Sequence, residues 1–126
     1  MNLRSVRVTG EEATGIEIIS ATQEIDVDRD ITVKCGSKGA TGIDIITVGR
    51  EINNEVETGD GVTVSSAGGD AVGIHTAARS DGHIDLEVEG DTRVSSDSGE
   101  STGIAAYADR DSSVTIAIEG DLSTRG

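Results

Sequence analysis

Large aromatic side chains are almost absent from this sequence. It has no Phe and no Trp, and Tyr107 is its single Tyr among 126 residues. Hydrophobic residues of all kinds make up 34% of the chain. A core made from this sequence is therefore narrow and filled with Ile, Val, Leu and Ala, so the backbone segments around it must lie close together.

Proline, cysteine and long apolar runs are also lacking. The absence of Pro and the presence of 17 Gly indicate frequent turns without rigid linkers. Cys35 is the single cysteine, so an internal disulfide is excluded. No run approaches the length of about 18 apolar residues that a membrane-spanning helix needs. The first ten residues, MNLRSVRVTG, lack the apolar region of a signal peptide.

Basic residues are few relative to acidic ones. The chain has 10 Lys and Arg against 24 Asp and Glu, which gives a formal net charge of −14. Such an acidic surface repels phosphate backbones and anionic lipid, so we expect no nucleic-acid binding and no direct membrane insertion. High charge with few aromatics also occurs in disordered chains, but the apolar residues here are periodic, which favours folding.

The sequence does contain an internal repeat. A Gly-Ile pair occurs four times, at intervals of 27, 31 and 30 residues. The four pairs are Gly15-Ile16, Gly42-Ile43, Gly73-Ile74 and Gly103-Ile104. Self-similarity at this period is typical of stacked structural units. Because the sequence starts within one unit and ends at Gly126 without a closing element, we expect it to be part of a longer chain.

Two further columns of residues follow the same repeat. A valine lies nine residues before the Gly of each pair, and a β-branched residue lies ten or eleven residues after it. The first column is Val6, Val33, Val64 and Val94. The second column is Ile25, Ile52, Ile84 and Val114. We therefore predict that the members of each column are neighbours in space on successive units.

Apolar and polar residues alternate within each unit, which is typical of strands and excludes helices. The alternation occurs after the Gly-Ile pair, before it, and at the second column. Examples are Ile43-Asp44-Ile45, Val62-Thr63-Val64 and Ile84-Asp85-Leu86-Glu87-Val88. Stretches of Gly, Ser and Asp separate these segments, so each unit contains three short strands.

These features predict an all-β fold, a right-handed parallel β-helix (β-solenoid) of about four coils. Each coil has roughly 30 residues and three short strands, and residues 1–126 form a single β-solenoid segment. Each strand bonds to its copy in the next coil, about 4.8 Å away. The right-handed sense is the usual one for parallel crossovers. An antiparallel sandwich uses similar strands, but it does not require a strand to resemble the one a full unit later.

Two polar residues fit this layout poorly. Arg29 falls in an apolar column with Val56, Val88 and Ile118. Asn54 falls in another, with Val27, Leu86 and Ile116. An unpaired charge cannot be buried, so we expect the short first coil to turn early and leave Arg29 outside. We expect Asn54 to bond to the backbone of a neighbouring turn.

Short motifs also recur from unit to unit. One reads Ala40-Thr41-Gly42-Ile43, Ala71-Val72-Gly73-Ile74 and Ser101-Thr102-Gly103-Ile104. A later strand ends in Gly59-Asp60, Gly90-Asp91 and Gly120-Asp121, and a Val-x-Ser stretch follows. Over nearly the whole chain this pattern resembles the passenger domains of bacterial autotransporters; phage tailspikes and other secreted adhesins share it. The resemblance implies a right-handed β-helix displayed at the cell surface, as a stalk, an adhesin or a self-association module.

The candidate metal ligands are acidic residues at the end of the third strand. The predicted column is Asp30, Glu57, Glu89 and Glu119, and a second column is Asp28, Glu55 and Glu87. Like charges about 6 Å apart repel by roughly 3 kcal/mol at an effective dielectric constant of 20, and Ca²⁺ relieves such repulsion. The alternative is a solvated acidic face that discourages aggregation. Because the calcium-binding nonapeptide and the EF-hand loop are both absent, we favour the solvated face and expect no bound metal.

No catalytic or cofactor-binding residues are predicted. His75 shares an outward column with Glu17, Asp44 and Ala105, and His83 precedes a strand. No nucleophile or phosphate-binding loop accompanies them, so both are interpreted as surface residues. Cys35 shares a column with Val8, Ser66 and Ser96, which predicts a small core residue. Tyr107 shares one with Ile19, Ile46 and Ala77, where we expect it to cover a turn.

These observations favour a non-enzymatic structural or adhesive segment of a bacterial surface or secreted protein. The expected partners are neighbouring copies, joined end to end or side by side, and host-surface or glycan contacts. The alternative is a short piece of a carbohydrate-processing β-helix protein, a lyase or a tailspike-like enzyme. Such enzymes need more coils, a groove of acids and bases, and aromatics that stack on sugars, and this chain has no Trp or Phe.

Overall fold

The computed structural model describes residues 2–19, 23–49, 53–109 and 111–125, and these form strands and turns without any helix. The strands belong to three sheets, which we call A, B and C. Sheet A contains β1 (Asn2–Leu3), β4 (Gln23–Val27), β7 (Asn53–Thr58), β10 (His83–Val88) and β13 (Ser113–Ile118). Sheet B contains β2 (Val6–Gly10), β5 (Ile31–Cys35), β8 (Val62–Ser66), β11 (Thr92–Ser96) and β14 (Leu122–Arg125). Sheet C contains β3 (Ala13–Ile19), β6 (Ala40–Val48), β9 (Ala71–Arg79) and β12 (Ser101–Ala108).

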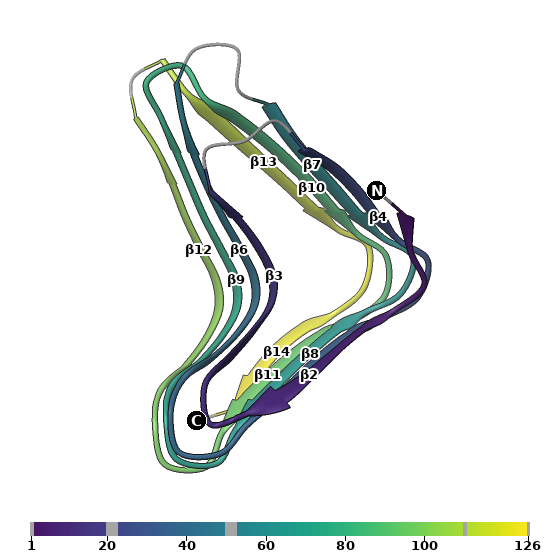
Figure 1. Cartoon of the computed structure of the whole chain (residues 1–126), viewed down its shortest axis with the longest axis vertical. Helices are drawn as coiled ribbons and strands as arrows, with labels where there is room; N and C mark the ends of the chain where they lie inside the picture. Colours follow the sequence, from purple (N-terminus) through teal and green to yellow (C-terminus); the bar gives the residue numbers. More distant parts are fainter. Residues whose placement is uncertain (1, 20–22, 50–52, 110, 126) are drawn as a thin grey trace.

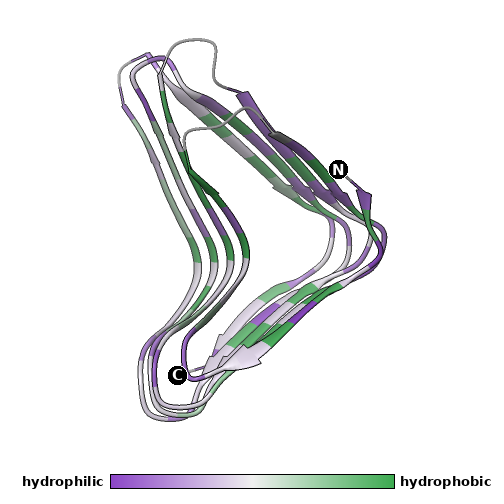
Figure 2. Cartoon of the chain, viewed as in Figure 1, coloured by the Kyte–Doolittle hydropathy of each residue, from purple (hydrophilic) through white to green (hydrophobic). Residues whose placement is uncertain are grey.

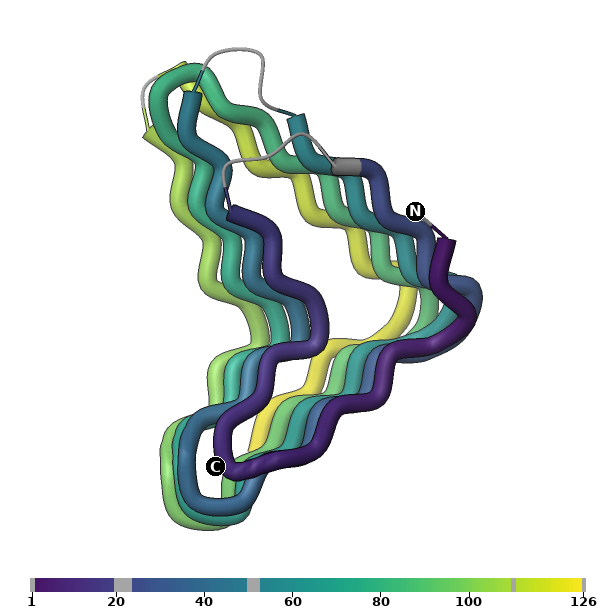
Figure 3. Tube along the Cα trace, viewed as in Figure 1, coloured from purple at the N-terminus to yellow at the C-terminus, as the bar shows by residue number. Residues whose placement is uncertain are grey.

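Every strand pair in the described part of the chain is parallel, and each strand bonds to the strand three later in sequence. The chain therefore passes through sheets A, B and C in turn and coils around one core (Figures 1 and 3). This confirms the predicted parallel β-solenoid of about four coils with three strands per coil. It also excludes the antiparallel sandwich.

The core is a set of aliphatic ladders that run along the solenoid. In sheet C the isoleucines of the four Gly-Ile pairs stack in register, as predicted: Ile16, Ile43, Ile74 and Ile104. Ile43 and Ile74, in the middle coils, are fully buried. Figure 2 shows hydrophobic and hydrophilic residues alternating along the strands of sheets A and B. The alternation places apolar side chains inside and polar side chains outside.

The glycines of the Gly-Ile pairs allow sheet C to approach sheet B. A Cβ added at Gly42 would lie 2.6 Å from the carbonyl oxygen of Gly73 and 2.8 Å from side-chain atoms of Val62 and Val64. Gly73 has the same surroundings one coil later, with Val94 at 2.7 Å. The repeated glycine is thus explained by a close contact between two sheets, which a larger residue would prevent.

The predicted valine column in sheet B is wrong in the first coil. Val8, and not Val6, pairs with Val33, while Val6 pairs with Ile31. The cause is the turn from sheet B to sheet C, which spans three positions from Gly10 to Ala13 in the first coil. The equivalent turn spans five positions in each later coil. Counting back from the glycine therefore places the first valine two residues too early.

The predicted column in sheet A is also shifted. Ile25 pairs with Val56, and Ile84 pairs with Asn54 and Val114. Ile52 lies outside the described residues. The turn from sheet C to sheet A sets this register, because its length differs between coils. From the sheet C column that contains Ile19 to the sheet A column that contains Gln23, the chain advances four positions in the first coil, eight in the second and seven in the third and fourth. Sequence spacing from the Gly-Ile pair therefore does not predict sheet A.

The two misfit residues are accommodated differently. Arg29 lies in the turn after β4 with its side chain exposed, as expected of a coil that turns early. Asn54 does not share a column with Leu86, because it pairs with Ile84, yet it is 2% exposed. Its Nδ2 donates a hydrogen bond to the Thr47 hydroxyl at 2.5 Å. This partner is a side chain of β6, and the expected bond to a turn backbone stays a prediction.

Candidate functional site

The outer face of sheet A is a continuous acidic surface. Strands β4, β7 and β10 each carry two carboxylates at outward positions, in two columns along the solenoid. The first column is Glu24, Glu55 and Asp85, and the second is Asp26, Glu57 and Glu87. No Lys or Arg occurs in any of the five strands of this sheet. We call these six residues the acidic face.

The predicted metal-ligand column of Asp30, Glu57, Glu89 and Glu119 does not exist as one column. Glu57 pairs with Glu87 and Asp26 on the strands themselves. Glu89 follows the end of β10, and Glu119 follows that of β13 one coil later. Asp30 lies in the turn before β5, where its carboxylate accepts a hydrogen bond from the Thr32 hydroxyl at 3.0 Å. The shifted register of sheet A separates these residues.

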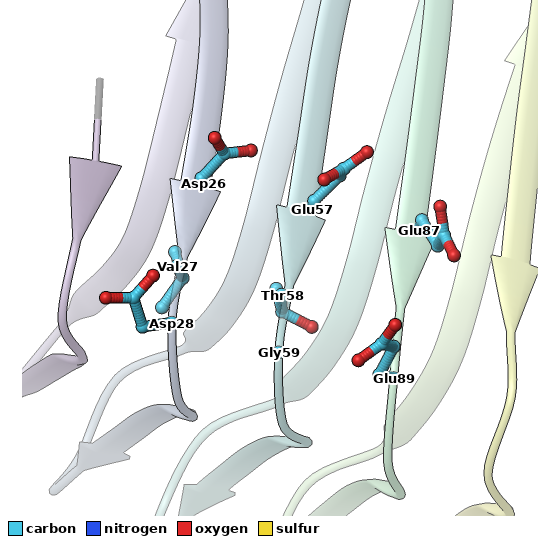
Figure 4. A pocket seen from close by; sticks show the side chains of 8 residues that line it. All are labelled: Asp26, Val27, Asp28, Glu57, Thr58, Gly59, Glu87 and Glu89. Atoms are coloured by element: carbon cyan, nitrogen blue, oxygen red, sulfur yellow. The ribbon is translucent and has the colours of Figure 1, made fainter.

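The second predicted column is likewise divided. Glu55 pairs with Asp85, Glu87 pairs with Glu57, and Asp28 lies beyond the end of β4. A shallow depression crosses this end of the acidic face, lined by residues of three successive coils. Figure 4 shows Asp26, Glu57 and Glu87 side by side on neighbouring strands, with Asp28 and Glu89 just beyond them. Carboxylates of three coils thus line one surface.

Desolvation and the neighbouring carboxylates both affect the protonation of Glu57, the central member of this row. The pKa of Glu57 is raised above its ordinary value of 4.5, first by desolvation and then by the charges of Asp26, Glu55 and Glu87. Among the described residues, no three His, Cys, Asp or Glu side chains converge in a way that could hold a metal ion. The arrangement is suited to attracting positive charge over an extended area rather than to chelating one ion. The expected absence of a bound metal stays a prediction.

The turns between sheets A and B use aspartates to tie successive coils together. Asp91 Oδ1 accepts a hydrogen bond from the backbone N–H of Asp121 at 2.9 Å, and Asp91 Oδ2 lies 3.2 Å from Arg93. Asp70 does the same in another turn, accepting from the N–H of Glu100 at 2.9 Å. Asp91 of the Gly90-Asp91 motif, like Asp70, thus has a structural role, because its carboxylate satisfies the backbone of the next coil.

The histidines make surface hydrogen bonds. His75 occupies the predicted column with Glu17, Asp44 and Ala105, and its Nδ1 lies 2.8 Å from Asp44 Oδ1. His83 Nδ1 lies 2.7 Å from the Ser113 hydroxyl at the start of the next strand. His75 lies on sheet C and His83 on sheet A, so the structure does not bring the two imidazoles into one site.

Cys35 is the buried last residue of β5. It pairs with Ser66 as predicted, but its partner in the first coil is Gly10 and not Val8. Ser66 Oγ donates to the Lys38 carbonyl at 2.9 Å and accepts from the Gly69 N–H at 3.0 Å, and Ser96 repeats both bonds one coil later. Burial raises the pKa of the Cys35 thiol, which therefore stays protonated.

Tyr107 lies in the predicted column, paired with Ala77, and is 53% exposed. The guanidinium of Arg79 lies 5.2 Å from the centroid of its ring, within range of a cation–π interaction. Ile19, in the same column of sheet C, is also exposed. Both exposed side chains belong to sheet C and lie outside the acidic face.

The outer face of sheet B is basic, a feature that sequence reasoning missed. Its outward positions include Arg7, Lys34, Arg93 and Arg125, and its five strands contain no Asp or Glu. The sequence offered a signal, since each of these bases alternates with inward apolar or small residues. An overall charge of −14 concealed it, because no acid lies on the strands themselves, although Asp30, Asp60 and Asp91 in the preceding turns border this face.

The described residues contain no helix long and apolar enough to cross a membrane. No family model, curated protein or solved structure matches the chain.

Proposed function

We propose that the chain is a non-enzymatic structural and adhesive segment, a rigid rod at the surface of a bacterial cell or in a secreted protein. Its partners are neighbouring copies and, at the cell surface, host or glycan surfaces. The resemblance of its repeat motifs to autotransporter passengers supports the surface location.

The observation that carries this proposal is the unbroken register of the three sheets. Each sheet continues in register through every described coil, around a core of stacked aliphatic side chains. Such a ladder resists bending, because each coil is hydrogen-bonded to its neighbours along all three walls. It also builds long outer faces, and such faces suit repeated weak contacts better than a single enclosed site.

The proposal is tested by displaying residues 1–126 on bacterial cells through an inert membrane anchor. Cells that carry the segment should aggregate and settle faster than cells that carry the anchor alone. The variant G42A/G73A, in which the contact between sheets B and C is disrupted, is a second control. An epitope tag measures the surface copy number, so that cells with equal numbers are compared. The adhesive role would be contradicted if cells that display the wild-type segment stay dispersed, at the same surface copy number as the control cells, and are not retained on host cells or glycan arrays.

The non-enzymatic part of the proposal has its own test. The purified chain should release no new reducing ends or unsaturated sugars from acidic and neutral polysaccharides. Release of either product would replace the structural role with the carbohydrate-processing alternative.

A further inference from the structure

Sheets A and B present opposite charge on their outer faces. The acidic face of sheet A has six carboxylates on its strands, and sheet B has four bases on its strands. Neither sheet has a strand residue of the other sign. This separation of charge is more complete than the composition suggests. If the 24 acids and 10 bases were placed at random along the chain, both signs would occur on the strands of each sheet.

The bases of sheet B are distributed along the solenoid and not clustered in one coil. Strands β2, β5, β11 and β14 each carry one: Arg7, Lys34, Arg93 and Arg125. All four side chains are exposed. Within the part of the chain that the structure describes, Arg93 is paired with Asp91, and the other three make no ion pair.

The two faces match in spacing as well as in sign. Successive strands of both sheets are separated by one coil, about 4.8 Å, because the same coils build both sheets. When two solenoids lie side by side, charges therefore meet at several coils, because β4, β7 and β10 carry acids and every strand of sheet B except β8 carries a base. The Ser and Thr residues between the bases, such as Thr32, Thr63 and Ser65, add small hydrogen-bonding groups to a flat surface.

We propose that the basic face of sheet B in one copy docks laterally on the acidic face of sheet A in a second copy. This inference rests on the proposed self-association and assigns it to two particular faces. The contact joins different surfaces of the two molecules, so it is heterologous, and a pair of copies retains one free acidic face and one free basic face. Association therefore continues beyond a dimer unless the assembly closes into a ring.

The test is sedimentation velocity of the purified chain at about 0.02 M and about 0.5 M NaCl, where screening lengths differ several-fold. We expect a series of oligomers at low salt and monomers at high salt. The variant R7E/K34E reverses two bases of sheet B and should weaken association at low salt by about tenfold or more.

The matched control is R4E/K38E. Arg4 and Lys38 are exposed bases in turns outside the strands of sheet B, and both double variants change the net charge by the same four units. The control should associate like the wild type. Equal loss of association in both variants would overturn the assignment to sheet B, as would association that does not respond to salt.

A charge exchange tests the partner face. The variant E55K/E57K places two bases on the acidic face and should also associate poorly alone. Mixed with R7E/K34E, it should restore oligomers, because the altered faces are again opposite in sign. Failure of the mixture to associate, with both variants folded, would exclude sheet A as the partner. If the purified chain shows no lateral contact while displayed cells still aggregate, the adhesive role holds and only this assignment fails.

Discussion

The glycine column between sheets B and C and the carboxylate columns of sheet A are both built from residues that recur once per coil, but they are maintained by different forces. At Gly42 the next coil and the opposite sheet leave no room for a Cβ. At Glu57 the side chain is exposed, and neighbouring carboxylates repel it. The first column is fixed by steric exclusion, whereas the second is tolerated at some cost in stability.

This difference indicates at which positions of the solenoid the amino acid can change. A contact between sheets tolerates almost no change, because the coils on both sides are held by their own hydrogen bonds. An exposed column tolerates any residue that water or a partner can solvate. Folding therefore does not explain why acids recur on an exposed face where they repel one another. A contact between this face and a basic surface provides an explanation.

The largest effect is expected from closing the space at the glycine column. Gly42→Ala should reduce the free energy of unfolding by about 3 kcal/mol, because the new methyl group meets backbone and two valine side chains. Urea denaturation followed by circular dichroism measures the change. Gly36→Ala is the matched control, since the nearest atom to its Cβ would lie at 3.9 Å, and it should change stability little. Equal effects at the two positions would contradict the close contact.

A smaller loss is expected at the buried amide in sheet A. Asn54→Ala should cost about 2 kcal/mol, because it removes the partner of the Thr47 hydroxyl, which is itself fully buried. Replacing both residues by valine should recover most of that loss, since both partners of this hydrogen bond are then removed together. A double-mutant cycle by urea denaturation measures the coupling. If the two substitutions are additive, the hydrogen bond is not the reason for the polar pair.

The strands, the parallel stacking and the sheet C register follow from the sequence because the Gly-Ile pair is constrained on both sides. The register of sheet A does not follow. Ile25 was expected beside Ile84 but shares a column with Leu86, a slip of two residues. A slip of two keeps every side chain on the same face of the sheet, so alternation cannot detect it. Only the turn lengths reveal it, and turns are under little constraint from the core.

The candidate site was predicted only in its general character. An acidic surface on the third strand was expected and is present, but the column of Asp30, Glu57, Glu89 and Glu119 was wrong for the same register reason. The basic face of sheet B was missed because residues such as Arg7 and Lys34 lie far apart in sequence. Stacked coils bring such scattered residues onto one surface.

A minor effect is expected at the free thiol. Cys35→Ser should change stability by less than about 1 kcal/mol, because serine already fills the equivalent strand-end position at Ser66 and Ser96 and bonds to the backbone there. In the wild type the buried thiol, whose pKa is raised by burial, should react slowly with a maleimide at neutral pH until the protein is unfolded. Rapid reaction of the native protein would show that the turn opens.

The smallest effect is expected on the exposed carboxylates of sheet A. Because the pKa of Glu57 is raised in the folded state, its contribution to stability is present at low pH and is lost as the pH rises through that raised value. Glu57→Gln should therefore raise the melting temperature slightly at pH 7 and leave it unchanged near pH 4, a difference measurable by scanning calorimetry. Glu11→Gln, in an exposed turn, is the control. A lower melting temperature at pH 7 would mean that the acidic row stabilises the isolated chain.

The coil-to-coil register is tested most directly by NMR, through close contacts between backbone protons of residues one coil apart. A parallel solenoid predicts that Val64 is near both Val33 and Val94, and that Asn54 is near Ile84. Contacts of Val64 with an antiparallel neighbour from the preceding or following strand, in place of these, would contradict the stacked coils and the charged faces derived from them.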